Sequence, residues 1–195
     1  MRPTGRQRLS SGLALLLCTS LLPGIAWGQS PTSPFSPTIL DELEPPPLRW
    51  ERQGRYIVYE DSTVTDSRTQ LMWMRCPYGQ LYDFRWRTCT GRAERMAWEE
   101  ATAVARDRVH GHSDWRLPTR AELLSLTERQ RGRPPIDLRV FPGTPSGPFW
   151  TGTPFQARSE LVWYVYFDHG GVPAYGERDY PRYVRLVRDA PPLPD

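Results

Sequence analysis

The amino-acid sequence predicts an α+β domain in which two helices pack on short antiparallel strands. Three observations lead to this fold class. Short segments rich in β-forming residues lie near both ends of the expected domain, amphipathic segments lie between them, and a long Pro- and Gly-rich connection follows the second amphipathic segment. Strands followed by helices and then by further strands are typical of an α+β domain rather than of a parallel α/β fold.

The chain begins with the features of a secretory signal peptide. Three arginines within the first eight residues precede the apolar stretch SGLALLLCTSLLPGIAWG, and the small residues Ala26 and Gly28 stand at the positions that a signal peptidase reads. We expect residues 1–28 to be removed before Gln29. The apolar stretch is short for a membrane span, so no integral span is expected after removal. The exported chain is then periplasmic or extracellular.

Proline-rich segments flank the expected domain. Residues 29–49 form a predicted arm and residues 189–195 a tail, which leaves 50–188 as one domain of ordinary size. The chain has no lysine, and three of its 25 arginines leave with the signal. The remaining 22 arginines balance 22 Asp and Glu residues. Global charge therefore gives no argument for nucleic acid as a partner.

Two strands and a disulfide are expected in the first part of the domain. The stretch RYIVYE, residues 55–60, alternates and is rich in β-formers, and LMWMRC, residues 71–76, is apolar, whereas the residues between them favour turns. Cys76 and Cys89 are an even pair in an exported chain, which predicts a disulfide. Zinc ligands and a redox pair are the rival interpretations, but the spacing is far from C-x-x-C and no nearby histidine supplies further ligands.

Two helices are expected in the middle of the domain. Residues 93–109 are amphipathic, and the following His110 and Gly111 form a plausible stop. One face of this helix holds Ala97, Ala101, Val104 and Ala105. The second helix is expected over residues 119–130, with three leucines directed inward.

The stretch GHSDWRLPTRAEL, residues 111–123, is interpreted as a structural joint between the helices. Thr119 and Glu122 have the spacing of a capping box, while Trp115 and Leu117 are expected in the core. A catalytic role lacks a nucleophile and base pair, so no catalytic residue is predicted. The residues of this structural motif are Asp114, Trp115, Arg116, Leu117, Pro118, Thr119 and Glu122.

Short strands return after residue 148, and they carry the predicted ligand surface. If one face of the stretch LVWYVYFD, residues 161–168, points outward, its tyrosines form a platform on which sugar rings stack. Nearby arginines suit bidentate binding of sulfate or carboxylate. The rival interpretations are a Tyr face covered by the long loop and arginines paired on the surface. The predicted ligand residues are Tyr164, Tyr166, Tyr175, Tyr183, Arg182, Arg185, Arg129 and Arg131.

The order of several motifs resembles the Lcl C-terminal domain family, named after a bacterial collagen-like adhesin. The motifs are VTDSRTQLMWMR, MAWEEATAVARD, GHSDWRLPTRAELLSL, PPIDLRVFP, FWTGTPF, WYVYFDHGGV and YVRLVRD, from about Tyr56 to Arg188. The resemblance implies a C-type lectin-like fold, export and, for the name-giving adhesin, binding of sulfated polysaccharides. A Pro-rich arm stands here in place of that adhesin's collagen-like stalk.

The shorter motif RLPT-x-x-E is also similar to the formylglycine-generating, sulfatase-modifying family. Oxidase members of that family need a reactive cysteine pair late in the chain, and no cysteine follows Cys89. A calcium site could use Asp168, Glu177 and Asp179, but no asparagine assists them and Arg178 stands between two of them. The chain's histidines lack the spacing of metal ligands. No metal or other cofactor is therefore predicted.

The leading hypothesis is an exported, noncatalytic module that binds an anionic glycan or an envelope or extracellular protein. The alternative is a structural or assembly subunit of an envelope complex that binds no sugar. An enzyme of the formylglycine-generating type is the third hypothesis, which the missing late cysteines and nucleophile–base pair disfavour. The sequence leaves the oligomeric state open.

Overall fold

The structure, a computed structural model, describes residues 49–107, 109–128, 132–168 and 170–193. The predicted signal and nearly all of the predicted arm lie outside these residues, so both stay predictions. Within the described ranges, no helix is long and apolar enough to cross a membrane.

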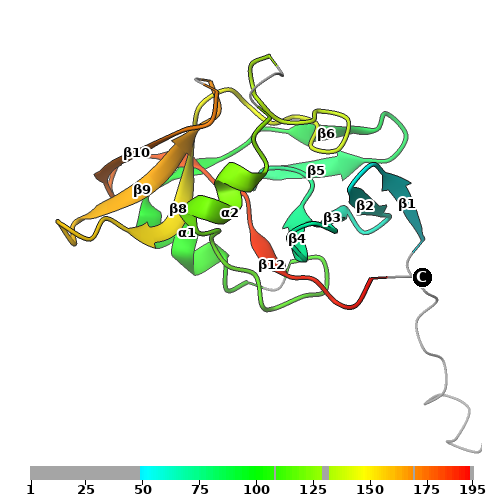
Figure 1. Ribbon diagram of the computed structural model, residues 1–195, viewed down its shortest axis with the longest axis horizontal. Coiled ribbons are helices and arrows are strands. Elements are labelled where there is room, and N and C mark those ends of the chain that lie inside the picture. Colours follow the sequence, from blue (N-terminus) through cyan, green and yellow to red (C-terminus); the bar gives the residue numbers. More distant parts are fainter. Residues whose placement is uncertain (1–48, 108, 129–131, 169, 194–195) are drawn as a thin grey trace, which may run out of the picture. The chain divides into compact units, whose positions relative to one another are not determined.

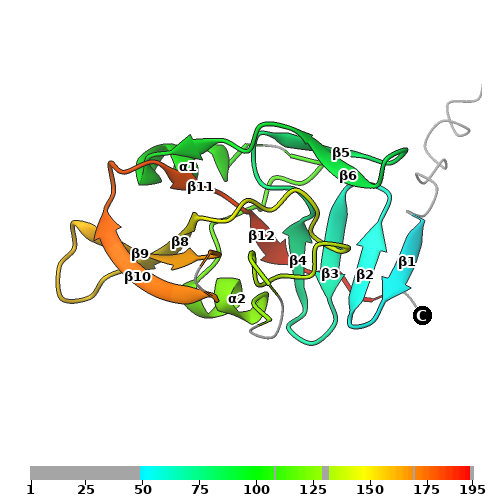
Figure 2. The same cartoon turned by 90° about the horizontal axis from the view of Figure 1, so that it is seen from above.

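The first sheet is a four-stranded meander that the C-terminal strand completes. In spatial order its strands are β1 (Trp50–Gln53), β2 (Tyr56–Tyr59), β3 (Thr63–Asp66), β4 (Leu71–Met74) and β12 (Val187–Asp189). All neighbours are antiparallel, and Val187 pairs with Trp73 at the last junction. Figures 1 and 2 show β12, at the red end of the colour scale, beside β4. The end of the domain thus completes the sheet with which the domain begins.

The second sheet gathers the late strands and one early strand. Its order is β10 (Val172–Glu177), β9 (Leu161–Tyr166), β8 (Pro148–Pro154), β11 (Arg182–Tyr183) and β7 (Arg95–Met96). β11 runs parallel to β8, and the other pairs are antiparallel. The stretch YVRLVR, residues 183–188, is the last of the short strands expected from the sequence, and it is divided between β11 in this sheet and β12 in the first sheet.

Side chains from both faces of the first sheet are buried. Tyr56 and Val58 belong to one core cluster, and the alternating Ile57 and Tyr59 belong to another. The first cluster also contains residues of α2 (Arg120–Ser125), and the second contains Ala101 of α1 (Trp98–Val104). Continuous burial explains why β2 and β4 are apolar at almost every position instead of alternating with polar residues.

A two-stranded hairpin forms the third sheet and shares no strand pairing with the other two. It consists of β5 (Gln80–Asp83) and β6 (Thr88–Gly91), which pair over four residues each. The predicted disulfide is confirmed: Cys76 and Cys89 are joined with an Sγ–Sγ distance of 2.04 Å. The disulfide therefore fixes β6 to the chain that leaves β4.

The predicted α+β class, a C-type lectin-like domain with two helices packed on strands, is wrong. The described residues form twelve strands in three sheets, and the helices contain only seven and six residues. The predicted helices are too long because β7 takes Arg95 and Met96, and because the second helix ends at Ser125. Strands also form where turns are predicted, as in β3, since pairing with β2 and β4 outweighs local propensity.

The joint before α2 has the predicted structural contacts. Thr119 Oγ1 accepts from the Glu122 amide at 3.2 Å, and Glu122 Oε2 accepts from the Thr119 amide at 2.7 Å. Arg116 holds the same carboxylate through both guanidinium Nη atoms, at 2.7 and 2.8 Å. Trp115 and Leu117 are buried, and Asp114 accepts from Arg188 Nε at 2.7 Å. The motif therefore starts a helix and anchors it to the core.

Replacing Glu122 with Gln is expected to lower the free energy of unfolding by about 1–2 kcal/mol at neutral pH. Burial acts to raise the pKa of Glu122, but hydrogen bonds from Arg116 and Thr119 outweigh it and lower the pKa below its ordinary value. A lowered folded-state pKa stabilises the protein above the unfolded-state value, and this contribution disappears as pH falls through the folded-state value. Urea titrations from pH 7 to pH 3 measure the difference in the free energy of unfolding between wild type and E122Q.

The difference between wild type and E122Q should therefore shrink as the pH falls below about 4.5. E100Q is the matched control, because Glu100 caps the Ala97 amide of α1 through one hydrogen bond of 3.0 Å. A difference for E122Q that stays constant down to pH 3 contradicts the proposed role of the carboxylate charge.

Candidate functional site

Tyr164 of β9 does not belong to an exposed aromatic platform. Its side chain is only 8% exposed, it meets the Trp150 ring edge-on, and the Arg182 guanidinium lies 3.9 Å from its ring centroid. Both faces of β9 are covered, since Val165 packs into one core cluster and Tyr164 into the other. Side chains of β8 and β11 thus contribute to burying the tyrosine that is predicted to bind a ligand.

Arg182 is equally enclosed. Its guanidinium lies between the rings of Trp150 and Tyr164, 4.2 and 3.9 Å from their centroids. Nη1 donates to the backbone carbonyls of Glu177 and Tyr180 at 3.1 and 2.9 Å. These contacts fix the loop between β10 and β11, so the residue has a structural role whether or not it also meets a ligand.

Arg185 is 1% exposed and lies in the interior. Nη1 donates to the carbonyls of Met74 and Arg75 at 2.7 and 2.6 Å, and Nη2 donates to Thr144 Oγ1 at 2.7 Å. Burial lowers the pKa of Arg185 to about 9, which still leaves the group charged at neutral pH. A guanidinium in this position cannot reach a ligand in solvent.

The remaining predicted tyrosines differ in their exposure and in the residues that they contact. Tyr166 and Tyr183 are half-buried, whereas Tyr175 is exposed and stacks on Phe155 with ring centroids 4.0 Å apart. Tyr175 and Tyr180 line a hollow of about 400 Å³ with Arg182. The predicted residues Arg129 and Arg131 lie outside the described residues.

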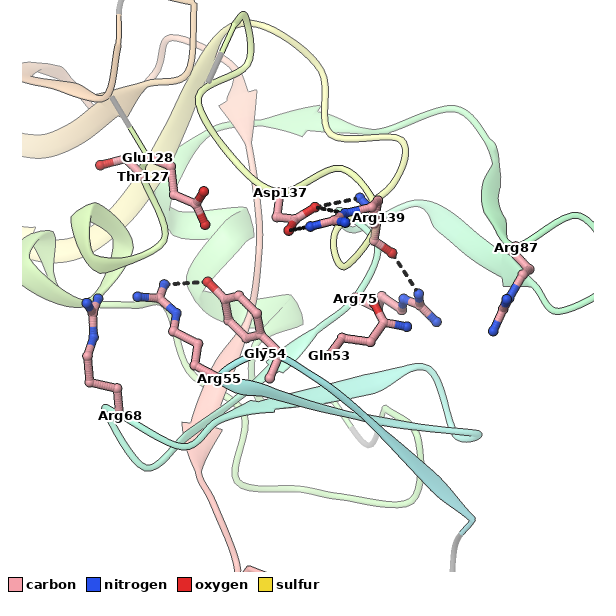
Figure 3. A pocket seen from close by; sticks show the side chains of 11 residues that line it. Gln53, Gly54, Arg55, Arg68, Arg75, Arg87, Thr127, Glu128, Asp137 and Arg139 are labelled. Carbon is pink, nitrogen blue, oxygen red and sulfur yellow. Dashed lines mark hydrogen bonds and ion pairs between the residues drawn. The ribbon is translucent and has the colours of Figure 1, made fainter. Parts of the chain in front are cut away.

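An arginine-lined cleft occupies a different part of the molecule. It has a volume of about 810 Å³, and the turn between β1 and β2 forms one wall while the loop around Asp137 forms another (Figure 3). Figure 3 shows Arg55 and Arg68 at one end, Arg75 and Arg87 toward the other, and Arg139 on the loop. The lining contains five arginines, namely Arg55, Arg68, Arg75, Arg87 and Arg139, against the two carboxylates of Glu128 and Asp137.

Two of these arginines are held firmly by the protein. Arg55 pairs with buried Asp66 at 3.3 Å and donates to the Ser125 carbonyl at 2.9 Å. Arg75 donates to the carbonyls of Val140 and Arg139 at 2.9 and 3.0 Å, and burial lowers its pKa. These contacts hold the two guanidinium groups in place before a ligand binds. Less side-chain entropy is therefore lost on binding.

The other three arginines are exposed and more loosely held. Arg68 makes one long contact, 3.4 Å, to the Ser125 carbonyl. Arg87 pairs with Glu51 at 3.1 Å on the surface, where the ion pair is worth little. Arg139 is bound bidentately to Asp137 but keeps a side-chain exposure of 79%. Their guanidinium groups supply the donors that a bound anion would meet.

A second, smaller hollow shares two lining residues with the cleft and adds aromatic side chains. Both hollows are lined by Arg75 and Arg87, and the second, of about 320 Å³, is also lined by Trp50, Tyr82 and Phe84. Arg75 lies over the Tyr82 ring, 4.1 Å from its centroid. Charged donors and aromatic faces therefore follow one another along the same surface.

Sequence reasoning missed this cleft because its arginines come from five separate segments between residues 55 and 139. None shares a strand face or a helical spacing with another, so no local pattern marks them. The sheet order brings them together: β1 and β2 contribute one wall, and the chain after α2 contributes the other. Among the described residues, no group of three or more His, Cys, Asp or Glu side chains is placed to hold a metal ion.

The fold and this site define a mostly β, disulfide-bonded domain with an arginine-lined cleft. The family model of the Lcl C-terminal domain matches residues 62–188. The chain belongs to the Lcl C-terminal domain family, which confirms the resemblance seen in its motifs. A search of curated proteins finds no match to the chain.

Proposed function

We propose that the chain is an exported, noncatalytic module that binds an anionic ligand, in the first place an anionic glycan, in the arginine-lined cleft. The observation that carries this proposal is the positive charge of the lining, which contains five arginines but only two carboxylates. Guanidinium groups bind sulfate and carboxylate bidentately, and the neighbouring Trp50, Tyr82 and Phe84 offer faces on which sugar rings stack. A disulfide is compatible with an oxidising compartment outside the cytoplasm.

Heparin chromatography tests the cleft with a matched pair of double variants. R68A with R87A removes two exposed arginines of the cleft, and R106A with R158A removes two exposed arginines that do not line it. We expect the cleft variant to bind heparin about tenfold more weakly or worse, since each lost charge-assisted hydrogen bond costs about 1.5 kcal/mol or more. The control variant should elute close to wild type.

Equal losses for the two double variants would show only a general effect of charge, and the cleft would not be the site. Wild-type protein that is not retained on a heparin column at low salt would contradict the proposed binding of an anionic glycan. A glycan array then separates the polysaccharide class, because sulfated and carboxylated chains present different anions to the same arginines.

A second candidate is an assembly role without sugar binding. The observation behind it is the burial of Tyr164 and Arg182, which leaves the late strands without the predicted sugar platform. Co-purification from envelope fractions distinguishes this role: a partner that remains bound to the R68A/R87A variant does not depend on the cleft.

A further inference from the structure

The hairpin of β5 and β6 presents an unusual concentration of exposed apolar side chains. Leu81, Phe84 and Trp86 are 72%, 53% and 70% exposed, and Trp50 at the start of β1 is 41% exposed. Trp50 and Phe84 line the same hollow, so the start of β1 lies beside the hairpin. These four residues, named here the hairpin patch, are half of the eight large hydrophobic residues exposed in the described ranges. Exposed apolar side chains concentrated on one short hairpin are typical of an interaction surface.

A disulfide, turn hydrogen bonds and a ring contact stabilise the hairpin that carries the hairpin patch. The disulfide between Cys76 and Cys89 fixes β6. Asp83 Oδ1 accepts from the amides of Arg85 and Trp86 at 2.8 and 3.1 Å, which fixes the turn. The rings of Tyr82 and Phe84 meet edge-on with centroids 5.0 Å apart. The hairpin backbone is therefore ordered before binding, so little conformational entropy is lost when the patch binds another surface.

The charges around the hairpin patch favour an anionic surface. The Asp83 carboxylate is engaged with turn amides, and Glu51 is paired with Arg87 at 3.1 Å. Arg85 lies 5.5 Å from the Trp86 ring centroid, and exposed Arg49 precedes Trp50. Asp83 and Glu51 are thus engaged within the protein, whereas exposed Glu60 lines the hollow of Trp50 and Phe84. The guanidinium groups of Arg49 and Arg85 lie next to exposed rings.

We propose that the hairpin patch binds the interface of an anionic lipid bilayer, with its aromatic rings at the headgroup level and Arg49 and Arg85 against lipid phosphates. Tryptophan favours this boundary because its ring is apolar and its N–H is polar, and arginine beside the interface is attracted by anionic lipids. Even at about 200 Å² apiece, four partly exposed side chains offer less than the roughly 800 Å² that a standard protein interface buries per partner. The small, basic patch therefore fits a bilayer interface better than a protein.

Vesicle sedimentation of the exported protein tests this proposal. The wild type is compared with F84S/W86S and with Y180S, whose tyrosine is 63% exposed outside the patch. Vesicles contain either phosphatidylcholine alone or an equal mixture with phosphatidylglycerol. We expect binding to the mixed vesicles at low salt, a loss of about tenfold or more for F84S/W86S, and wild-type binding for Y180S. All variants share the same N-terminal residues, so differences arise from the substitutions.

Thermal melts first establish that F84S/W86S is folded, and R85E provides a second variant that keeps every apolar side chain. R85E is expected to weaken binding to the mixed vesicles and to leave any binding to phosphatidylcholine unchanged. Wild-type protein that remains in the supernatant with mixed vesicles overturns the proposal, as does equal binding by wild type and F84S/W86S. A soluble protein that binds the hairpin and competes with vesicles for wild type would assign the patch to a protein partner instead.

Discussion

Replacing Trp115 with Ala is expected to lower the free energy of unfolding by about 3–5 kcal/mol, a large part of the roughly 5–15 kcal/mol that stabilises an ordinary domain. The side chain is 4% exposed and packs in the cluster that also holds Ile57, Met72 and Trp150. Its Nε1 donates to the Val109 carbonyl at 2.8 Å. Truncation therefore opens a cavity and removes a buried hydrogen bond together.

Thermal and urea melts measure this loss, and W86A is the matched control. Trp86 is 70% exposed, so the same truncation there leaves no cavity and should change stability by less than about 0.5 kcal/mol. A W115A protein that melts like wild type refutes the assignment of the GHSDWRLPTRAEL stretch as a structural joint. In that case, the heparin binding of folded W115A and of wild type would be compared, to test whether the stretch has a binding role.

Replacing Arg185 with Ala is expected to destabilise the protein by a similar amount, about 3–5 kcal/mol. The variant loses the donors to Met74, Arg75 and Thr144, whose oxygens are left in the interior with fewer partners. It also leaves the space of one of the largest fully buried side chains. An unsatisfied buried acceptor carries its full desolvation cost.

Two further variants at this position separate volume from hydrogen bonding. R185M fills the space without a charge, so it avoids the cost of burying the guanidinium and should lose less stability than R185A. R185K keeps a charge but has one nitrogen in place of the fork that reaches the carbonyls of Met74 and Arg75 and the hydroxyl of Thr144. Urea midpoints that place R185A at or above R185M would contradict a packing role for this side chain.

Local sequence patterns predict the elements that depend on short-range chemistry. The capping box needs only Thr119 and Glu122 at the correct spacing, and it is present. The alternation in RYIVYE and the apolar run LMWMR correspond to β2 and β4. The predicted removal of the signal with Cys18 leaves Cys76 and Cys89 as an even pair, and these two cysteines form the disulfide. Each of these features is decided within a few residues or by pairing an even number of cysteines.

Features that depend on distant partners could not be read in the same way. The period of residues 93–109 favours a long helix, but Arg95 and Met96 pair with β11 instead. The tyrosine face of β9 looks free in sequence because strand alternation assigns one face to the core and says nothing about the other. In the structure Trp150 and Arg182 pack against Tyr164 on that second face, so Tyr164 is buried and Tyr166 is half-buried.

The sequence by itself therefore determined the family, the disulfide and the helix-starting joint, since each depends on residue identity at fixed spacing. Only the tertiary structure decided the predominance of β-sheet, the burial of Arg182 and Arg185, and the cleft that gathers arginines from five segments. The physical reason is that sheet order and side-chain burial arise from contacts between strands far apart in the chain. A guanidinium that packs on Phe141 in the core and one that lines a cleft have the same local sequence signal.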